Sequence, residues 1–187
     1  MPRVPDTRGP ADPQSAAWNA LRPEMADAFI NLSRAVYVSS TLSLRVSEAA
    51  RMRIAEINGC LACQGFRLAA DADELAARVG AAPSEEWADR GPAPDEAFYS
   101  AVNSWREASV FSTRERLALE YAERIAETPQ DTPHDDEFWS RLRDAFDEGE
   151  IVDLTYSITT WIAVGRFTHT LDFDGSCDLP VAVRPTA

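Results

Sequence analysis

The chain has 187 residues, 45% of them hydrophobic, so it is long enough to bury one core and too short to make two ordinary domains the default. Its formal net charge of −13 excludes a surface built for nucleic acid, because phosphate contacts need clustered Lys and Arg. No segment reaches the roughly 18 consecutive apolar residues of a membrane helix and the first residues lack the apolar core of a signal peptide, so we expect a cytoplasmic protein with no membrane partner.

The first elements in chain order are an arm and two helices. Four prolines among polar residues predict an extended or disordered arm over residues 1–15, followed by a single domain over residues 16–187. Apolar residues at three- and four-residue steps indicate a broken helical pattern from 16 to 38, and Pro23 suits the first turn of a helix that begins near it. Residues 44–57 predict the next helix, which carries Glu48.

Two cysteines, two residues apart, follow this helix. Asn58-Gly59 supplies its end, because Gly tolerates the left-handed conformation common at helix C-termini. Cys60 then falls at or near the start of another helix, where unpaired backbone N–H groups favour a thiolate, and Cys63 lies one turn further on. In a cytosolic protein such a pair is more often reactive than structural, so the sequence predicts thiol chemistry.

The rest of the chain is helical or irregular. Residues 73–79 predict a short helix ended by Gly80, and the proline-rich residues 81–94 predict a loop. Ser112 followed by Glu115 is a capping box, which opens a helix to about residue 127.

Two more helices complete the prediction. Thr132-Pro133 predicts the start of a helix that contains Phe138, Leu142 and Phe146, and a long apolar stripe predicts a helix over residues 148–170. Residues 179–183 alone show strand-like alternation. The expected fold class is therefore all-α.

The spacing of Glu48, Asn58-Gly59, Cys60 and Cys63 resembles the AhpD-like, or carboxymuconolactone decarboxylase, superfamily of all-helical proteins. Its redox members carry Glu, eleven residues, Cys, two residues, Cys, three residues and His. The final position departs from this pattern, because the residue four after Cys63 is Arg67. The resemblance runs from about residue 42 to residue 167 and includes the helical segments at 111–121 and 150–155.

The resemblance implies an AhpD-like helical bundle with alkylhydroperoxidase activity. Cys63 would attack a hydroperoxide, Cys60 would resolve the product into a disulfide, and Glu48 would act as base or proton relay. Helix-end electrostatics alone favours Cys60 as the more acidic thiol, so the two arguments disagree on roles. The expected partners are a hydroperoxide substrate, a dithiol reductant and further copies of the chain, in a dimer, trimer or hexamer, with no bound cofactor and no metal.

Arg67 limits which roles of the resembled family can apply to this chain. Arginine stays protonated, so it cannot relay a proton as histidine does, but it can stabilise a thiolate, pair with Glu48 or bind an anionic group. We therefore expect dithiol–disulfide cycling with weak or altered peroxidase activity. His169 is the substitute relay that the sequence offers, although a helix-end position explains it more simply.

Other interpretations stay open. A lactone decarboxylase-like enzyme would use Arg67 to hold the carboxylate of a small organic acid, but the decarboxylases of the superfamily lack the cysteine pair. A non-catalytic oligomeric helical protein and a pair of merely buried cysteines are further alternatives. A zinc site would need ligands beyond the pair, and the remaining candidates are Cys177, His134 and His169.

Several side chains are most simply interpreted as structural or solvent-exposed residues. Arg51 and Arg53 are expected on a solvated or subunit-facing side unless either meets a carboxylate. The tryptophans are expected in the core or an interface, with one of them able to line an apolar pocket beside Cys63; they are Trp105, Trp139 and Trp161.

Overall fold

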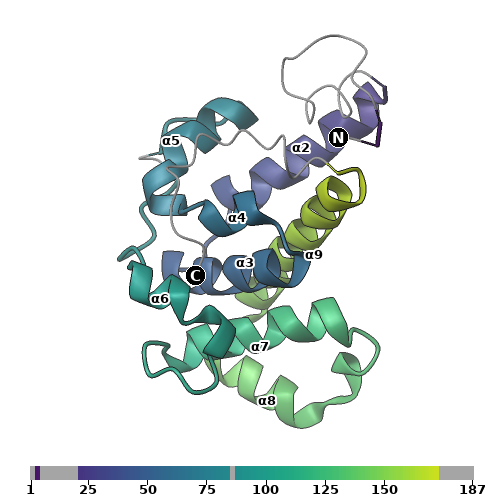
Figure 1. The fold of residues 1–187 in the computed structure, drawn as a ribbon. Helices are drawn as coiled ribbons and strands as arrows, with labels where there is room; N and C mark the ends of the chain where they lie inside the picture. Colours follow the sequence, from purple (N-terminus) through teal and green to yellow (C-terminus); the bar gives the residue numbers. More distant parts are fainter. Residues whose placement is uncertain (1–2, 5–20, 85–86, 173–187) are drawn as a thin grey trace.

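The computed structural model describes residues 3–4, 21–84 and 87–172. Within these residues the fold is all-α, as predicted, and contains no strand (Figure 1). Most of the predicted arm at 1–15, together with Cys177 and the segment 179–183, lies outside the described residues. The elements are α2 (Pro23–Val38), α3 (Leu44–Asn58), α4 (Leu61–Gly65), α5 (Leu68–Val79), α6 (Glu96–Ser100), η3 (Val102–Ser104), α7 (Thr113–Glu127), η4 (Thr132–His134), α8 (Asp136–Ala145) and α9 (Glu148–Thr170).

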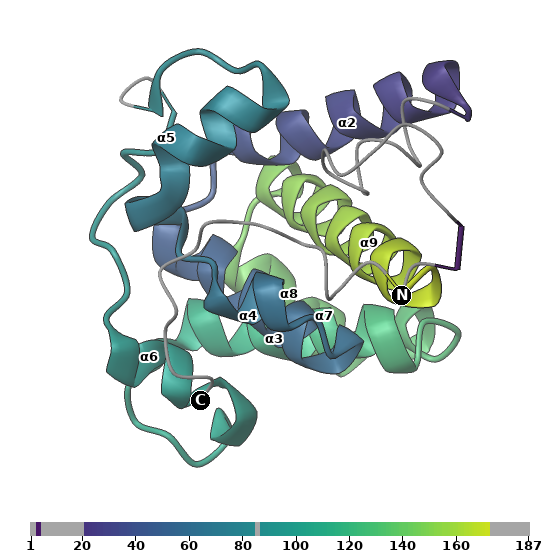
Figure 2. The same cartoon turned by 45° about the horizontal axis from the view of Figure 1, so that its top comes forward.

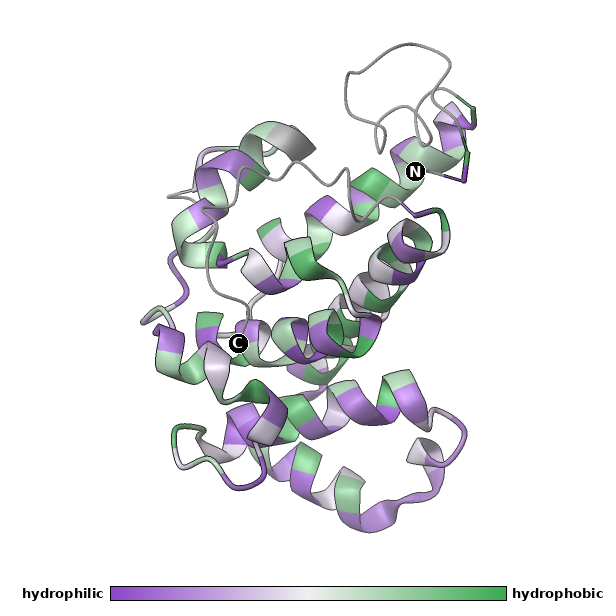
Figure 3. Cartoon of the chain, viewed as in Figure 1, coloured by the Kyte–Doolittle hydropathy of each residue, from purple (hydrophilic) through white to green (hydrophobic). Residues whose placement is uncertain are grey.

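Helix α3 lies at the centre of the molecule and packs against α7 and α9 (Figure 2). Its N-cap is Ser43, whose side chain accepts a hydrogen bond from the N–H of Val46, and its C-cap is Gly59, which adopts the predicted left-handed conformation with φ of 67°. Figure 3 shows hydrophobic and hydrophilic residues alternating along the helices, as expected where each helix buries one side. The main core joins α3, α7, α8 and α9.

Helices α2 and α9 pack side by side and antiparallel. Asp153, near the start of α9, accepts hydrogen bonds from Ser40 and Thr41, which follow α2, at 3.0 and 2.8 Å. At the other end the rings of Phe29 and Phe167 lie 6.1 Å apart. These contacts fix the long last helix against the first described helix.

Two smaller apolar clusters flank α3. One contains Met52 of α3, Phe98 and Tyr99 of α6, and Trp105 after η3, and it extends to Leu119 of α7. The other lies on α5 and its connections, and it includes Phe66, Leu68 and Trp87. The segment between α5 and α7 therefore does more than connect helices, because it covers one side of α3.

Most predicted helices are confirmed, with two differences at helix starts. Helix α5 begins at Leu68, five residues earlier than predicted, because the side chain of Asp71 accepts a hydrogen bond from the N–H of Arg67 at 2.7 Å. Thr132-Pro133 opens only the 3-10 turn η4, so the prediction of a continuous helix from that point was wrong.

Helix α8 has its own start. The side chain of Asp135 accepts a hydrogen bond from the N–H of Phe138 and caps α8. Phe146, predicted inside the helix, is its C-cap residue and still packs in the main core. Helix α6 was not predicted.

Within the described residues, no helix combines the length and apolar character that crossing a membrane requires.

Gly165 of α9 lies where the last turn of α3 reaches it. A Cβ atom at this position would collide with the amide side chain of Asn58, which donates a hydrogen bond to the carbonyl of Trp161 at 3.2 Å. We expect Gly165→Ala to lower the free energy of unfolding by about 1–3 kcal/mol through overpacking, measured by urea denaturation. In an Asn58→Ala background the same substitution should cost clearly less, and equal costs in both backgrounds would contradict this contact.

Candidate functional site

Cys60 and Cys63 form a disulfide at the start of α4, with their Cα atoms 5.3 Å apart. Cys60 is the N-cap residue, as predicted, and its sulfur accepts a hydrogen bond from the N–H of Cys63 at 3.3 Å. Cys60 is only 1% exposed, whereas Cys63 is half-buried. Cys63 is therefore the more accessible of the two cysteine residues.

Glu48 is completely buried in the middle of α3 and accepts four hydrogen bonds. Arg51 donates two of them, to Oε1 at 2.5 Å and to Oε2 at 3.1 Å. The hydroxyl of Tyr99 donates to Oε2 at 2.6 Å, and the N–H of Leu68 donates to the same oxygen at 3.3 Å. The carboxylate thus gathers donors from α3, α5 and α6.

Arg51 connects this carboxylate to the cysteine pair. Besides its bonds to Glu48, its guanidinium donates to the carbonyl of Cys63 at 2.7 Å and to that of Phe66 at 2.8 Å. Burial by itself would lower the pKa of Arg51, but the charge and hydrogen bonds of Glu48 outweigh burial and raise it above its ordinary value. Arg51 is 3% exposed, so the solvated position is wrong for it, and the alternative that it meets a carboxylate is confirmed.

Arg53, two residues further along α3, points to a different part of the molecule. Its guanidinium donates to Glu123 of α7 at 2.8 Å and to Asn103 of η3 at 3.1 Å. The two neighbouring arginines therefore have separate partners, and of the two only Arg51 has a described hydrogen bond to the cysteine-containing segment at 60–66.

Arg67 is also buried, but it makes its ion pair with Glu96 rather than Glu48. It donates to the two carboxylate oxygens of Glu96 at 3.1 and 3.0 Å. It also donates to the carbonyls of Gln64 and Phe66, and its guanidinium lies 3.9 Å from the ring centroid of Tyr99. The expected pairing of Arg67 with Glu48 is therefore not observed, because Glu48 pairs with Arg51.

Aromatic side chains enclose the site. Cys63 packs against the apolar cluster to which Tyr99 and Trp105 belong. Trp139 and Trp161 belong to the main core. His169 is exposed in the last turn of α9, and no three His, Cys, Asp or Glu side chains of the described residues are grouped to hold a metal ion.

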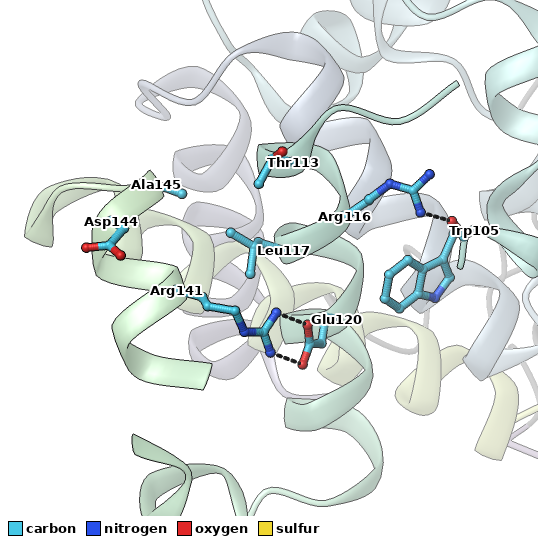
Figure 4. A pocket seen from close by; sticks show the side chains of 8 residues that line it. All are labelled: Trp105, Thr113, Arg116, Leu117, Glu120, Arg141, Asp144 and Ala145. Carbon is cyan, nitrogen blue, oxygen red and sulfur yellow. Dashed lines mark hydrogen bonds and ion pairs between the residues drawn. The ribbon is translucent and has the colours of Figure 1, made fainter. Parts of the chain in front are cut away.

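Trp105 also lines an open hollow of about 450 Å³ between α7 and α8 (Figure 4). Three of the charged side chains around it, Arg116, Glu120 and Arg141, have protein partners. Arg141 binds both oxygens of Glu120 at 2.9 Å, and Arg116 donates to backbone carbonyls, including that of Trp105 at 2.6 Å. The hollow contains no cysteine, and we do not count it as part of the site.

Comparison with known proteins supports the fold. No known family's sequence profile matches the chain. Over 82 residues it is 39% identical to the uncharacterized protein YnjA of Escherichia coli K12, and this match covers 43% of the chain and 44% of that relative. The chain thus matches less than half the length of this curated relative.

The structure is similar to a crystal structure of ATU0492 from Agrobacterium tumefaciens, a protein of unknown function suggested to be the antioxidant defence protein AhpD. The TM-score is 0.59 at 23% sequence identity, over 83% of this chain and 92% of that one. At this identity the similarity concerns the fold alone. The expected AhpD-like helical fold is therefore confirmed.

Tyr99 and Glu96 were not predicted from the sequence, and Arg51 was expected to meet a carboxylate only as an alternative, with no partner named. Arg51 stands three residues after Glu48 on one helix, and this spacing is a usable signal for an ion pair. Tyr99 and Glu96 lie on α6, a five-residue helix 48 or more positions along the chain, and no local pattern connects them to Glu48.

Because of Tyr99, the free energy of unfolding should decrease at alkaline pH. Burial first, and then the charge of Glu48, raise its pKa well above the ordinary value of 10.0. Because the folded-state pKa is the higher one, this stabilisation is complete below pH 10 and is lost as pH rises above it. Tyr99→Phe should cost about 1.5–3 kcal/mol at pH 7 through the lost hydrogen bond to a charged group.

Denaturation of both proteins between pH 7 and pH 11 tests this linkage. The stability gap between wild type and Tyr99→Phe should narrow above pH 10 by up to about 1.4 kcal/mol per pH unit. The comparison cancels the parallel contributions of Tyr37 and Tyr121, whose pKa values burial also raises. A gap that stays constant to pH 11 would show that Tyr99 does not titrate as described.

Proposed function

We propose that this protein is a thiol-dependent oxidoreductase that reduces organic hydroperoxides through a Cys60/Cys63 dithiol–disulfide cycle. The observation that carries the proposal is the asymmetric cysteine pair, with a buried Cys60 at the helix start bonded to a half-buried Cys63. The AhpD-like fold supports it. Such a cycle belongs in a reducing compartment, which agrees with the cytoplasmic location expected from the sequence.

The cycle has three balanced steps. The thiolate of Cys63 attacks the terminal oxygen of a hydroperoxide, so that the O–O bond breaks, an alcohol leaves with a proton, and Cys63 becomes a sulfenic acid. The sulfur of Cys60 then attacks that of Cys63, which forms the disulfide and releases water. A separate dithiol reductant returns two electrons and two protons by thiol–disulfide exchange.

The greater exposure of the Cys63 residue favours Cys63 as the attacking residue and Cys60 as the resolving one. This agrees with the roles implied by the resemblance rather than with helix-end acidity alone. Glu48 already accepts four hydrogen bonds, so we propose that it acts in the cycle chiefly by holding Arg51 against the carbonyl of Cys63. Slow peroxide turnover is expected from such a site.

Arg67 bears on the decarboxylase alternative. Its N–H groups are engaged by Glu96 and by two backbone carbonyls, and its charge faces the ring of Tyr99. Holding a substrate carboxylate would require breaking these contacts. The contacts of Arg67 therefore favour the thiol reaction over the decarboxylase-like one.

Reduced protein treated with one equivalent of cumene hydroperoxide tests the proposal. Acid quenching, alkylation and mass spectrometry should find a Cys60–Cys63 disulfide, in a Cys177→Ser background that removes the third thiol. Cys60→Ser should instead accumulate a sulfenic acid on Cys63 that dimedone captures. Dimedone labelling of Cys60 in a Cys63→Ser variant would reverse the assigned roles, and unreacted thiols in all three proteins would reject the peroxidase function.

We also propose that identical chains associate through α2 and α9. Met25 is 70% exposed and Tyr156 is 61% exposed, and further apolar residues on the same two helices are exposed as well: Leu32, Val152 and Phe167. Leu21, which precedes α2, is also exposed. Because α2 and α9 lie side by side, their exposed apolar rows supply the kind of surface that proteins usually cover. A second copy of the chain carries the same exposed apolar residues on α2 and α9, which can pack against those of the first copy.

Light scattering after size exclusion measures the assembly directly. Wild type should elute as a multiple of 20.6 kDa, and the double variant Met25→Glu/Tyr156→Glu should shift toward one chain. Ser140→Glu places one negative charge on the exposed surface of α8, outside α2 and α9, and should leave the mass unchanged. A monomeric wild type at micromolar concentration would refute the association.

A further inference from the structure

Buried guanidinium groups hold the C-terminal end of the helix that carries the cysteines. Helix α4 has only five residues, which is too short to be stable on its own. Arg51 donates to the carbonyls of Cys63 and Phe66 at 2.7 and 2.8 Å, and Arg67 donates to those of Gln64 and Phe66. Carbonyls at a helix end lack partners within the helix, so the two arginines satisfy them.

Each arginine is itself fixed from behind by a carboxylate. Glu48 binds Arg51 from within α3, and Glu96 of α6 binds Arg67. The two anchors differ in environment, because the side chain of Glu48 is fully buried whereas that of Glu96 is 62% exposed. The inner pair should therefore restrain α4 more strongly than the outer pair.

We propose that Arg51 and Arg67 are positioning residues that keep Cys63 within bonding reach of Cys60 while the disulfide is open. The inference rests on the thiol cycle proposed above and adds two residues that act through the backbone of α4. In the oxidised protein the S–S bond itself restrains the two residues. In the reduced protein that bond is absent, so the packing of Cys63 and the hydrogen bonds from the arginines to the backbone must restrain the segment. The arginines therefore have their effect in the reduced form.

This difference predicts a shift in a measurable equilibrium. Weakening an arginine contact gives the reduced segment more conformational freedom than the oxidised one, because the disulfide limits the latter. The reduced form is then favoured, and the disulfide becomes easier to reduce. A side chain that only supported the fold would destabilise both forms equally and leave this equilibrium unchanged.

The test uses Arg51→Lys and Arg67→Lys in the full chain, with Cys177→Ser throughout. Each protein is equilibrated with mixtures of reduced and oxidised dithiothreitol, in which the protein dithiol gives two electrons and two protons to the reagent's disulfide. Alkylation and mass spectrometry then give the dithiol fraction. We expect the equilibrium constant to move about tenfold toward the dithiol in Arg51→Lys, and less in Arg67→Lys, because lysine cannot reproduce the fork of hydrogen bonds.

Arg53→Lys is the matched control. It is the same substitution two residues away on the same helix, and it weakens an ion pair with Glu123 that does not involve α4. Its dithiol–disulfide equilibrium should equal that of wild type even if its melting temperature falls.

An equilibrium constant within twofold of wild type in both arginine variants would overturn the inference, whatever happens to their melting temperatures. If Arg51→Lys does not fold, Arg67→Lys decides the question, since its carboxylate anchor is exposed and its loss is milder. No hydroperoxide enters this measurement. Failure of the hydroperoxide reaction with a shifted equilibrium would therefore refute the proposed substrate and leave the positioning role standing.

Discussion

The buried ion pair between Glu48 and Arg51 is the interaction on which the arrangement of the site depends. Removing two charges from water is costly, and the cost is recovered only where the remaining donors and acceptors are satisfied. Glu48 receives two further hydrogen bonds, from Tyr99 and Leu68, and Arg51 reaches two carbonyls of the cysteine segment. The pair therefore requires α3, α4, α5 and α6 to meet in one geometry.

The cysteine-containing segment at 60–66 is held in place by contacts with neighbouring helices and with the Cys60 sulfur. Cys60 satisfies the N–H of Cys63 at one end of α4, the arginines satisfy carbonyls at the other, and the side of Cys63 packs on an aromatic cluster. None of these contacts comes from within the five-residue helix. The positions of the two sulfurs therefore depend on buried charged and aromatic side chains that belong to other helices. A change in the packing of those side chains should alter the chemistry of the two thiols.

Local signals in the sequence predicted much of this fold. Capping residues and apolar spacing located α3, α7 and α9. The spacing of Glu48, Cys60 and Cys63 singled out residues that the structure connects through Arg51. Partners supplied by distant segments could not be read in the same way. Tyr99 reaches Glu48 across 51 positions, and Arg67 selects Glu96 over Glu48 because of where α6 packs, a tertiary fact with no local pattern.

Arg67 stands where the pattern that the sequence resembles has histidine, and this difference changes the chemistry that is available at the position. Histidine at this position would change charge near neutral pH, whereas arginine carries a permanent charge that must be compensated when it is buried. Here an exposed carboxylate, two carbonyls and the face of Tyr99 provide that compensation. The guanidinium is consequently directed toward the end of α4 and away from proton transfer. Under the proposed cycle, the proton needed by the leaving alcohol then comes from solvent or from the thiols themselves, which limits the rate of peroxide reduction while preserving disulfide formation.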